Sequence, residues 1–163
     1  MGSGKTFTGK ALAEKFKFSF IDLDSYIENK EAKTINEIFE LKGESYFRET
    51  EKKYLEEIIK LDENSIVATG GGTPCFHNNM GLINKNGISF YLKATEETLI
   101  NRLILEASQR PLIKGLSEKE LKNFILKKLR ERERYYLQAK HVIDVEEENY
   151  MEKIISIIPT NYE

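Results

Sequence analysis

The chain opens with M-G-S-G-K-T at residues 1–6, and this hexapeptide decides the fold class. Its last three residues, Gly4, Lys5 and Thr6, match the end of the phosphate-binding loop pattern G-x-x-x-x-G-K-[ST]. Such a loop needs glycine because backbone N–H groups curve around phosphate oxygens, and a Cβ would obstruct that approach. We therefore expect Lys5 to reach the β- and γ-phosphates of a nucleotide and the Thr6 hydroxyl to hold Mg²⁺.

The residues around this hexapeptide extend the prediction. Downstream, apolar side chains recur at helical spacing, which predicts a helix over residues 5–16 whose positive N-terminal end faces the anion. Upstream, the first glycine of the pattern and the strand that normally delivers it do not occur in the sequence. We therefore expect Met1 to be an internal methionine, preceded in the intact protein by roughly ten residues, about one strand plus half a loop. The alternative is a flexible glycine turn before a helix.

Composition limits the classes of protein to consider. At 163 residues the chain suits one domain, residues 1–163, with a substantial core, and its single cysteine, Cys75, cannot form an internal disulfide. It contains neither an apolar run of membrane-spanning length nor a charged-then-apolar leader. A net charge of −2 argues against general nucleic-acid binding. We expect a cytoplasmic monomer without nucleic-acid or membrane partners.

Two carboxylates follow the second apolar run. The residues F-S-F-I at 18–21 predict a strand that ends in Asp22-Leu23-Asp24, and open α/β sheets bind ligands at the carboxyl ends of their strands. Alternation along a strand would point Asp22 and Asp24 to the same side, one near a metal and the other near a substrate hydroxyl. The alternative is that Asp24 caps the helix that begins near Ser25.

The next segment predicts two helices and one candidate cation. A capping box at 34–37 opens a helix through residue 41, Gly43 is typical of its left-handed stop, and a second helix is expected over 44–59. Arg48 lies in this second helix, three residues before Glu51, which could hold its guanidinium. On spacing alone, a surface ion pair is the alternative interpretation.

Three consecutive glycines, Gly70, Gly71 and Gly72, follow a predicted buried strand at 65–68. Consecutive glycines cost backbone entropy, so they usually mark a place where the main chain approaches another group closely. A flexible linker is the alternative, but linkers rarely lie between a β-branched run and a turn such as Thr73-Pro74. We expect backbone amides of this run to face a substrate.

The second half of the chain predicts a lid and a further cation. Arg110 is set into the loop 106–115, between helices expected at 95–105 and 117–140, and such loops are typical of mobile lids in phosphoryl transfer. The long helix carries Arg130, Arg132 and Arg134, which an exposed, salt-bridged face would also explain. A strand over 88–92, a strand over 141–144 and a closing helix over 149–158 complete the expected elements.

The order of these motifs resembles that of shikimate kinases. The remnant of the phosphate loop, the strand with D-x-D, F-R on a helix, the strand with G-G-G, R-P-L in a loop and R-x-x-x-Y at Arg132 to Tyr136 span residues 2 to about 149. The resemblance implies an α/β three-layer sandwich of the P-loop nucleoside-monophosphate-kinase type. Its five-stranded parallel sheet would be flanked by helices, with the first strand missing from these 163 residues. It also implies transfer of the ATP γ-phosphoryl group to the 3-hydroxyl of shikimate, on the route to chorismate and the aromatic amino acids.

The resemblance further implies residue roles. Asp24 would bind the ring hydroxyls and act as the base, and Asp22 and Thr6 would serve Mg²⁺. The shikimate carboxylate would be gripped by Arg48 and Arg132. Catalytic residues would be Lys5, Asp24 and Arg110. ATP would be bound by Gly2, Ser3, Gly4, Lys5, Thr6, Phe7 and the lid residue Arg110. The remaining substrate contacts would come from Gly70, Gly71 and Gly72. The shikimate-binding helical region would span about 25–60 and the lid about 106–118.

Elementary chemistry agrees with these roles, and two alternatives stay open. A small anion with vicinal hydroxyls needs planar cationic forks and hydroxyl acceptors, which arginine and aspartate supply. Another P-loop kinase of small molecules, such as a gluconate kinase or a nucleoside monophosphate kinase, would share the loop and the lid but not this order of motifs. A binding protein that has kept the fold and lost catalysis is the second alternative. Arg102 is only a loose counterpart of the family's adenine-flanking arginines.

Overall fold

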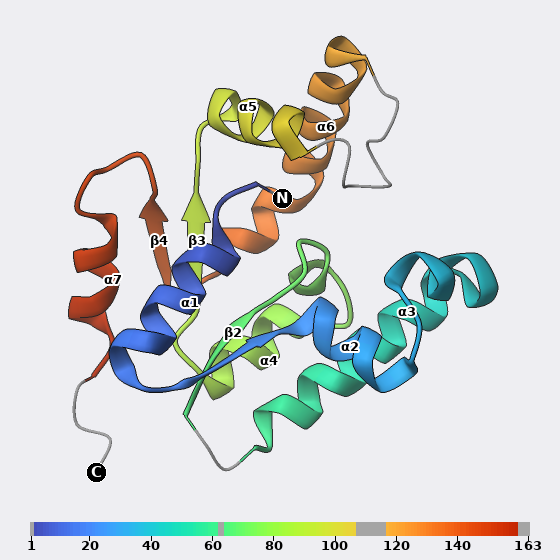
Figure 1. Ribbon diagram of the computed structural model, residues 1–163, viewed down its shortest axis with the longest axis horizontal. Helices are drawn as coiled ribbons and strands as arrows, with labels where there is room; N and C mark the ends of the chain where they lie inside the picture. The colour runs from blue at the N-terminus through green and yellow to red at the C-terminus, as the bar shows by residue number, and fades with distance from the viewer. Residues whose placement is uncertain (1, 62–63, 107–116, 160–163) are drawn as a thin grey trace. The chain divides into compact units, whose positions relative to one another are not determined.

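The structure is a computed structural model that describes residues 2–61, 64–106 and 117–159. The elements in the described part, in chain order, are α1 (Lys5–Phe16), β1 (Ser19–Asp22), α2 (Leu23–Glu31), α3 (Ile35–Ile59), β2 (Ser65–Ala68), the short 3₁₀ helix η1 (Thr73–Cys75), α4 (Asn79–Asn86), β3 (Phe90–Lys93), α5 (Glu96–Glu106), α6 (Glu118–Tyr136), β4 (His141–Asp144) and α7 (Tyr150–Ile157) (Figure 1). Helices and parallel strands therefore alternate along the chain, as the predicted α/β class requires.

The chain forms two compact units. Unit 1 contains residues 2–4 and Ile88–Ile158, and unit 2 contains Lys5–Gly87 with Pro159. The phosphate-loop hexapeptide thus crosses from unit 1 to unit 2 between Gly4 and Lys5. Each unit has a pair of parallel strands and its own buried apolar residues.

Unit 2 is built on the pairing of β1 with β2. The strands run parallel from Ser19 opposite Ser65 to Asp22 opposite Ala68, so their carboxyl ends lie together. Helix α1 packs against both strands, as Figure 1 shows. A glycine is required inside α1 because a Cβ on Gly9 would lie only 2.6 Å from the ring of Phe20 on β1.

Helices α2 and α3 supply the core of unit 2. Ile27 on α2 and Ile38 on α3 are fully buried in one cluster with Phe47. A capping box at Thr34 begins α3, as predicted, and Gly43 interrupts it with φ 80° and ψ 173°. The predicted break at Gly43 is confirmed. The helix that resumes there carries the candidate Arg48.

Unit 1 is built on the parallel pairing of β3 with β4, in which Phe90 lies opposite His141 and Lys93 opposite Asp144. Helix α7 packs on β4, and α5 packs on α6 through a cluster that includes Leu103 and Leu121. Helices α5 and α6 both begin with a cap: the Thr95 hydroxyl accepts from Thr98 N–H at 3.2 Å, and Ser117 begins α6 with a capping box.

The predicted five-stranded sheet is not observed, because the described strands form two separate two-stranded sheets. Strand positions also differ slightly from the expectation: the first strand begins at Ser19 rather than 18, and the third occupies Phe90–Lys93 rather than 88–92. The two short helices η1 and α4 were not predicted.

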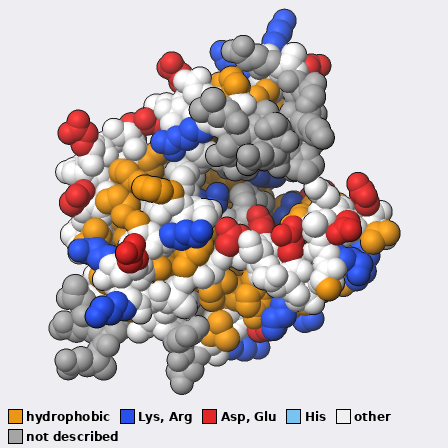
Figure 2. All heavy atoms as spheres, in the orientation of Figure 1, with side chains coloured by type: hydrophobic (Ala, Val, Ile, Leu, Met, Phe, Trp, Pro, Cys, Tyr) orange, Lys and Arg blue, Asp and Glu red, His pale blue; other side chains and the backbone are white. Residues whose placement is uncertain are grey.

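Neither charge sign dominates on the face of the molecule that Figure 2 shows. Figure 2 shows Lys and Arg interspersed with Asp and Glu and with hydrophobic patches on the visible face, in line with the net charge of −2. The hydrophobic side chains that are exposed in the described part are Phe7, Leu41, Tyr46, Leu61, Ile88, Ile104, Leu137 and Val142. Among the described helices, none has the length and apolar character needed to cross a bilayer.

Candidate active site

The phosphate-loop residues adopt the backbone conformation that the motif requires. Gly2 and Gly4 have φ values of 72° and 87°, in the left-handed region that side-chain-bearing residues rarely adopt. Helix α1 begins immediately afterwards at Lys5, so its N-terminal N–H groups follow the loop directly. In unit 1, Arg102 Nη1 donates to the carbonyl of Gly2 at 3.2 Å.

Asp22 joins the phosphate loop to the end of β1. Its Oδ1 accepts from Ser25 N–H at 3.2 Å, which makes Asp22 the N-cap of α2. Its Oδ2 accepts from the Thr6 hydroxyl at 3.4 Å. The alternative that Asp24 caps this helix is therefore wrong. The expected strand alternation of Asp22 and Asp24 is also wrong, because α2 already begins at Leu23 and Asp24 lies in its first helical turn.

Thr6 and Asp22 have side chains that are suited to binding Mg²⁺. A hydroxyl and a carboxylate are hard oxygen donors, and Mg²⁺ in kinases usually takes one or two protein ligands together with substrate phosphates and waters. Thr6 and Asp22 already lie within hydrogen-bonding distance of one another. In the part of the chain that the structure describes, no group of three or more His, Cys, Asp and Glu side chains could hold a metal ion.

Asp24 is an unusually weak acid for an aspartate. Although part of its side chain is in contact with solvent, the surrounding protein removes enough water to raise its pKa from 3.8 to about 6. The negative charges of Asp22 and Glu51 contribute to this same rise, and the positive charge of Lys5 opposes it. A carboxyl group with a pKa near 6 can accept a proton close to neutral pH.

The glycine run lies against Asp24 and Arg48. A Cβ on Gly70 would be 2.7 Å from Asp24 Oδ1, and a Cβ on Gly72 would be 2.7 Å from Arg48 Nη1. Both distances are too short for any other residue without displacement of the neighbouring side chain. Gly70 and Gly72 thus lie close to the two candidate substrate-binding side chains, and the expectation that backbone amides of this run face a substrate stays a prediction.

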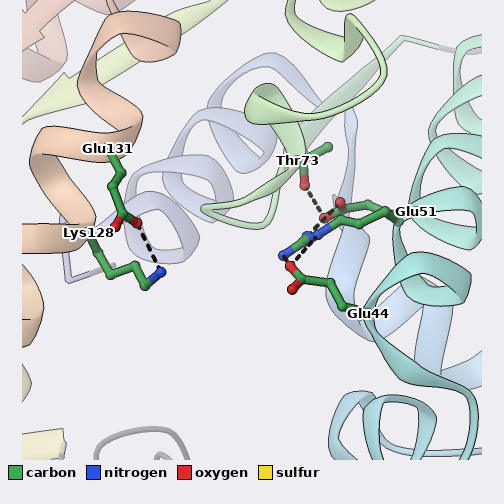
Figure 3. Close-up of polar contacts among 6 residues, drawn as sticks. Glu44, Glu51, Thr73, Lys128 and Glu131 are labelled. Carbon is green, nitrogen blue, oxygen red and sulfur yellow. Dashed lines mark hydrogen bonds and ion pairs between the residues drawn. The ribbon is translucent and has the colours of Figure 1, made fainter.

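Arg48 is a buried cation rather than a surface one. Its Nη1 donates to Glu51 Oε2 at 2.8 Å, and its Nε and Nη2 donate to Glu44 Oε1 at 3.3 and 3.1 Å. Arg48 is 9% exposed and Glu51 1%. Figure 3 shows Glu44 and Glu51 approaching the same guanidinium, with Thr73 reaching Glu51 from the other side. The expected Glu51 partner is confirmed, and the surface interpretation is wrong.

Glu51 links these groups. Its Oε1 accepts a 2.6 Å hydrogen bond from the Thr73 hydroxyl, while its Oε2 accepts from Arg48. Its charge also acts on Asp24. A fully buried carboxylate with two such partners holds the helix, the glycine loop and the guanidinium in one arrangement. Sequence reasoning missed Thr73 and Glu44; Glu44 stands at i−4 from Arg48, which is a recognisable pair spacing.

The structure also describes several of the other predicted residues. Gly71 and Ser3 are partly buried, whereas Phe7 is 73% exposed. Arg132 belongs to unit 1, where it is partly buried on α6. Arg110 and most of the predicted lid lie outside the described residues.

Within unit 2, the structure therefore brings together a buried guanidinium, a weak carboxylic acid and glycine backbone. They lie at the carboxyl ends of two parallel strands, beside the residue that begins the helix after the phosphate loop. This arrangement can hold an anionic molecule by its charge and accept a proton from its hydroxyl group.

The comparisons with known proteins agree with that chemistry. The family model described as shikimate kinase matches residues 1–160. A shikimate kinase from Azobacteroides pseudotrichonymphae is 47% identical over 159 residues, which cover 98% of this chain and 94% of that protein. One from Bacteroides thetaiotaomicron is 42% identical over 147 residues, which cover 90% of this chain and 83% of that protein.

Solved structures are similar over nearly the whole chain. The crystal structure of a shikimate kinase from Bacteroides thetaiotaomicron has a TM-score of 0.87 and 39% identity, covering 96% of this chain and 90% of that one. A shikimate kinase from Acinetobacter baumannii in complex with shikimate has a TM-score of 0.82 and 30% identity, covering 96% and 87%. The α/β fold, the candidate site and the family match agree: this chain belongs to the shikimate kinase family and is an ATP-dependent kinase.

Proposed function

We propose that the cluster around Asp24 and Arg48 binds shikimate and directs transfer of the ATP γ-phosphoryl group to its 3-hydroxyl, giving shikimate 3-phosphate and ADP. The observation that carries this proposal is the approach of both side chains to the glycine run, at Gly70 and Gly72. The solved Acinetobacter baumannii relative, described as a complex with shikimate, supports the choice of acceptor.

Arg48 is the proposed anchor for the shikimate carboxylate. A guanidinium has five N–H donors, and three of those of Arg48 are used by Glu44 and Glu51. A planar cation with donors to spare suits a carboxylate better than an ammonium group would. Arg132 is the proposed second anchor and Gly71 a proposed backbone contact, both on the family resemblance.

Asp24 is the proposed base. Its carboxyl group would orient the 3-hydroxyl and take its proton as the new P–O bond forms, which is the usual extent of acid–base help in phosphoryl transfer. The raised pKa near 6 leaves the group mostly ionised at neutral pH and still a useful acceptor. The neighbouring glycine at position 70 leaves space for the hydroxyl because it has no side chain.

The nucleotide is proposed to bind at residues 2–7, with Lys5 pairing with the transferring phosphoryl group. Thr6 and Asp22 would hold Mg²⁺, the latter through water. Bound Mg²⁺ would neutralise phosphate charge. Arg110 would bring a further positive charge from a lid at about 106–118, and the helical region at about 25–60 would carry most shikimate contacts. All these roles rest on the resemblance together with the geometry of the described residues.

We also propose a cellular and structural setting. The enzyme would act as a cytoplasmic monomer in aromatic amino acid biosynthesis, as one domain over residues 1–163. A five-stranded parallel sheet in a three-layer sandwich remains a proposal for the fold, supported by the TM-score of 0.87 to a solved relative.

A coupled assay of ADP release tests the function directly. The enzyme is offered shikimate, gluconate or nucleoside monophosphates with Mg²⁺ and ATP in parallel. We expect ADP release only with shikimate. Turnover of gluconate or of a nucleoside monophosphate alone would replace the proposed acceptor, and binding of shikimate without any ADP release would favour a non-catalytic relative.

The Arg48→Ala variant tests the anchor. It is expected to raise KM for shikimate by roughly 100-fold, because a charge-assisted pair of about 2–3 kcal/mol is lost, and to change KM for ATP less than threefold. Arg130→Ala, an exposed arginine on α6, is the matched control. An equal loss for both substrates would indicate a folding defect, which thermal unfolding of the variant would reveal.

A further inference from the structure

The segment after the glycine run places an aromatic ring on the guanidinium of Arg48. The centroid of the Phe76 ring lies 4.3 Å from Arg48 Cζ, closer than the rings of Phe47 at 5.0 Å and Phe39 at 5.9 Å. A guanidinium at this distance from a ring is attracted by the ring's negative face. Phe76 therefore makes the closest aromatic contact with the cation that we assign to the substrate carboxylate.

The backbone of this segment is held by its own hydrogen bonds. Thr73 N–H donates to Gly70 O at 3.1 Å and Cys75 N–H donates to Gly72 O at 2.9 Å. Asn79 fixes both ends of the turn, because its backbone N–H donates to Phe76 O at 2.9 Å and its Nδ2 donates to Thr73 O at 3.0 Å. Asn79 is fully buried. The backbone that carries Phe76 is thus held by local hydrogen bonds.

The guanidinium is held on its edges as well as on a face. Glu44 accepts from Nε and Nη2, and Glu51 accepts from Nη1. Thr73, three residues before Phe76, fixes the Glu51 carboxylate through a 2.6 Å hydrogen bond. The loop that begins with the glycine run therefore acts on Arg48 twice, through the ring of Phe76 directly and through Thr73 by way of Glu51.

We propose that Phe76 is a positioning residue for Arg48, and that Thr73 assists it through Glu51. The two residues hold the guanidinium plane in the orientation that receives the shikimate carboxylate, so that little side-chain freedom is lost on binding. This inference rests on the proposed role of Arg48 in shikimate binding. Loss of the Phe76 ring should therefore weaken the binding of shikimate and leave the binding of ATP unchanged.

A double-mutant cycle in the full chain tests it, with KM measured separately for shikimate and ATP. Phe76→Leu keeps the apolar volume and removes the ring, so KM for shikimate is expected to rise on the order of fivefold, with kcat at saturating shikimate and KM for ATP unchanged. Phe76→Tyr should restore the native value. Phe18→Leu, which removes a ring that stacks on Phe16 at 5.7 Å in the same unit, is the control and should change neither constant.

The second arm of the cycle uses Arg48→Lys, which keeps the charge and loses the planar fork. Phe76→Leu added to Arg48→Lys should raise KM for shikimate by much less than it does in the native chain. Thr73→Val should raise KM for shikimate, and Thr73→Ser should not.

The outcomes separate this inference from the function on which it rests. If Arg48→Lys leaves KM for shikimate unchanged, the proposed role of Arg48 is wrong. Suppose that Arg48→Lys raises KM for shikimate but Phe76→Leu leaves it unchanged: Phe76 then has no positioning role. The same conclusion follows if Phe76→Leu lowers thermal stability and changes KM for shikimate and KM for ATP together. Equal effects of Phe76→Leu in the native and Arg48→Lys chains also contradict the inference, because the ring would then act independently of the guanidinium.

Discussion

At the scale of single residues, the chemistry of the site depends on how charges are distributed around Asp24. Three further carboxylates, Asp22, Glu51 and Glu28, act on it, while Lys5 is the neighbouring cation. Glu51 is neutralised by Arg48, and Asp22 is engaged by Thr6 and Ser25. The proposed role of Asp24 as a base therefore rests on the surroundings that raise its pKa rather than on its residue type.

This raised proton affinity predicts a pH dependence of catalysis. A base with a pKa of about 6 is protonated and inactive below that pH, so kcat/KM for shikimate should rise with pH and level off above about 7. NMR titration of the Asp24 side-chain carbon in the free enzyme should give a midpoint near 6. A midpoint near 4, the ordinary value for aspartate, would remove the physical basis for this assignment.

The same pKa predicts that Asp24 lowers stability at neutral pH. Because the folded state binds the proton more tightly than the unfolded state, the contribution of Asp24 to stability is fully present below about pH 3.8 and is lost as the pH rises through about 6. Asp24→Asn, which stays neutral, should therefore be more stable than the native chain at pH 8, with a smaller difference at pH 4. Urea unfolding at the two pH values measures this. A variant that is less stable at pH 8 would contradict it.

At the scale of elements, the end of α2 stores a local strain. Ala32 caps this helix with φ 50° and ψ 37°, a left-handed conformation in which a Cβ costs about 1–2 kcal/mol. Ala32→Gly should relieve this strain, although glycine also gives the unfolded chain more conformational freedom. The net effect should be a free energy of unfolding that is higher by about 0.5–1 kcal/mol. Urea midpoints check this. Ala11→Gly within α1 is the opposite control and should destabilise by about 1 kcal/mol; destabilisation by both changes would exclude the strain.

The helices and strands whose boundaries are marked by clear signals in the sequence were predicted well. The helix at 5–16 and the strand at 141–144 match the structure residue for residue. The break at Gly43 was predictable because a glycine interrupts an amphipathic pattern. Helix α4 was missed although Met80 and Ile83 have helical spacing, since it begins after two consecutive left-handed residues, His77 and Asn78. Ordinary capping signals do not describe such a start.

The candidate site shows a similar division. The pairing of Arg48 with Glu51 was predictable from their spacing along one helix. Its burial was not, because burial depends on the loop that packs against it, and neither Thr73 nor Phe76 carries a local signal for a contact more than 20 positions away. Asp24 was selected because it follows a predicted strand, but it lies in the first turn of α2, and its closeness to Gly70 was not predictable from the sequence.

At the scale of the whole molecule, one proposed role concerns a residue of the other unit. Arg132 lies on α6 in unit 1, whereas Asp24 and Arg48 belong to unit 2. Among the described residues, Arg132 makes no hydrogen bond or ion pair, while Arg134 donates to the Tyr135 hydroxyl at 3.0 Å. Arg132 remains the proposed second anchor because Tyr136 stands four residues after it, as the family resemblance requires.

Separate substitution of Arg132 and Arg134 by alanine decides which of the two binds the shikimate carboxylate. Arg132→Ala should raise KM for shikimate roughly tenfold or more, equivalent to about 1.4 kcal/mol, with KM for ATP nearly unchanged, and Arg134→Ala should leave both constants as they are. The reverse result would shift the assignment by two residues along α6. If neither variant affects KM for shikimate while Arg48→Ala does, the acid is gripped by residues of unit 2, because a carboxylate that loses a bidentate partner cannot bind equally well.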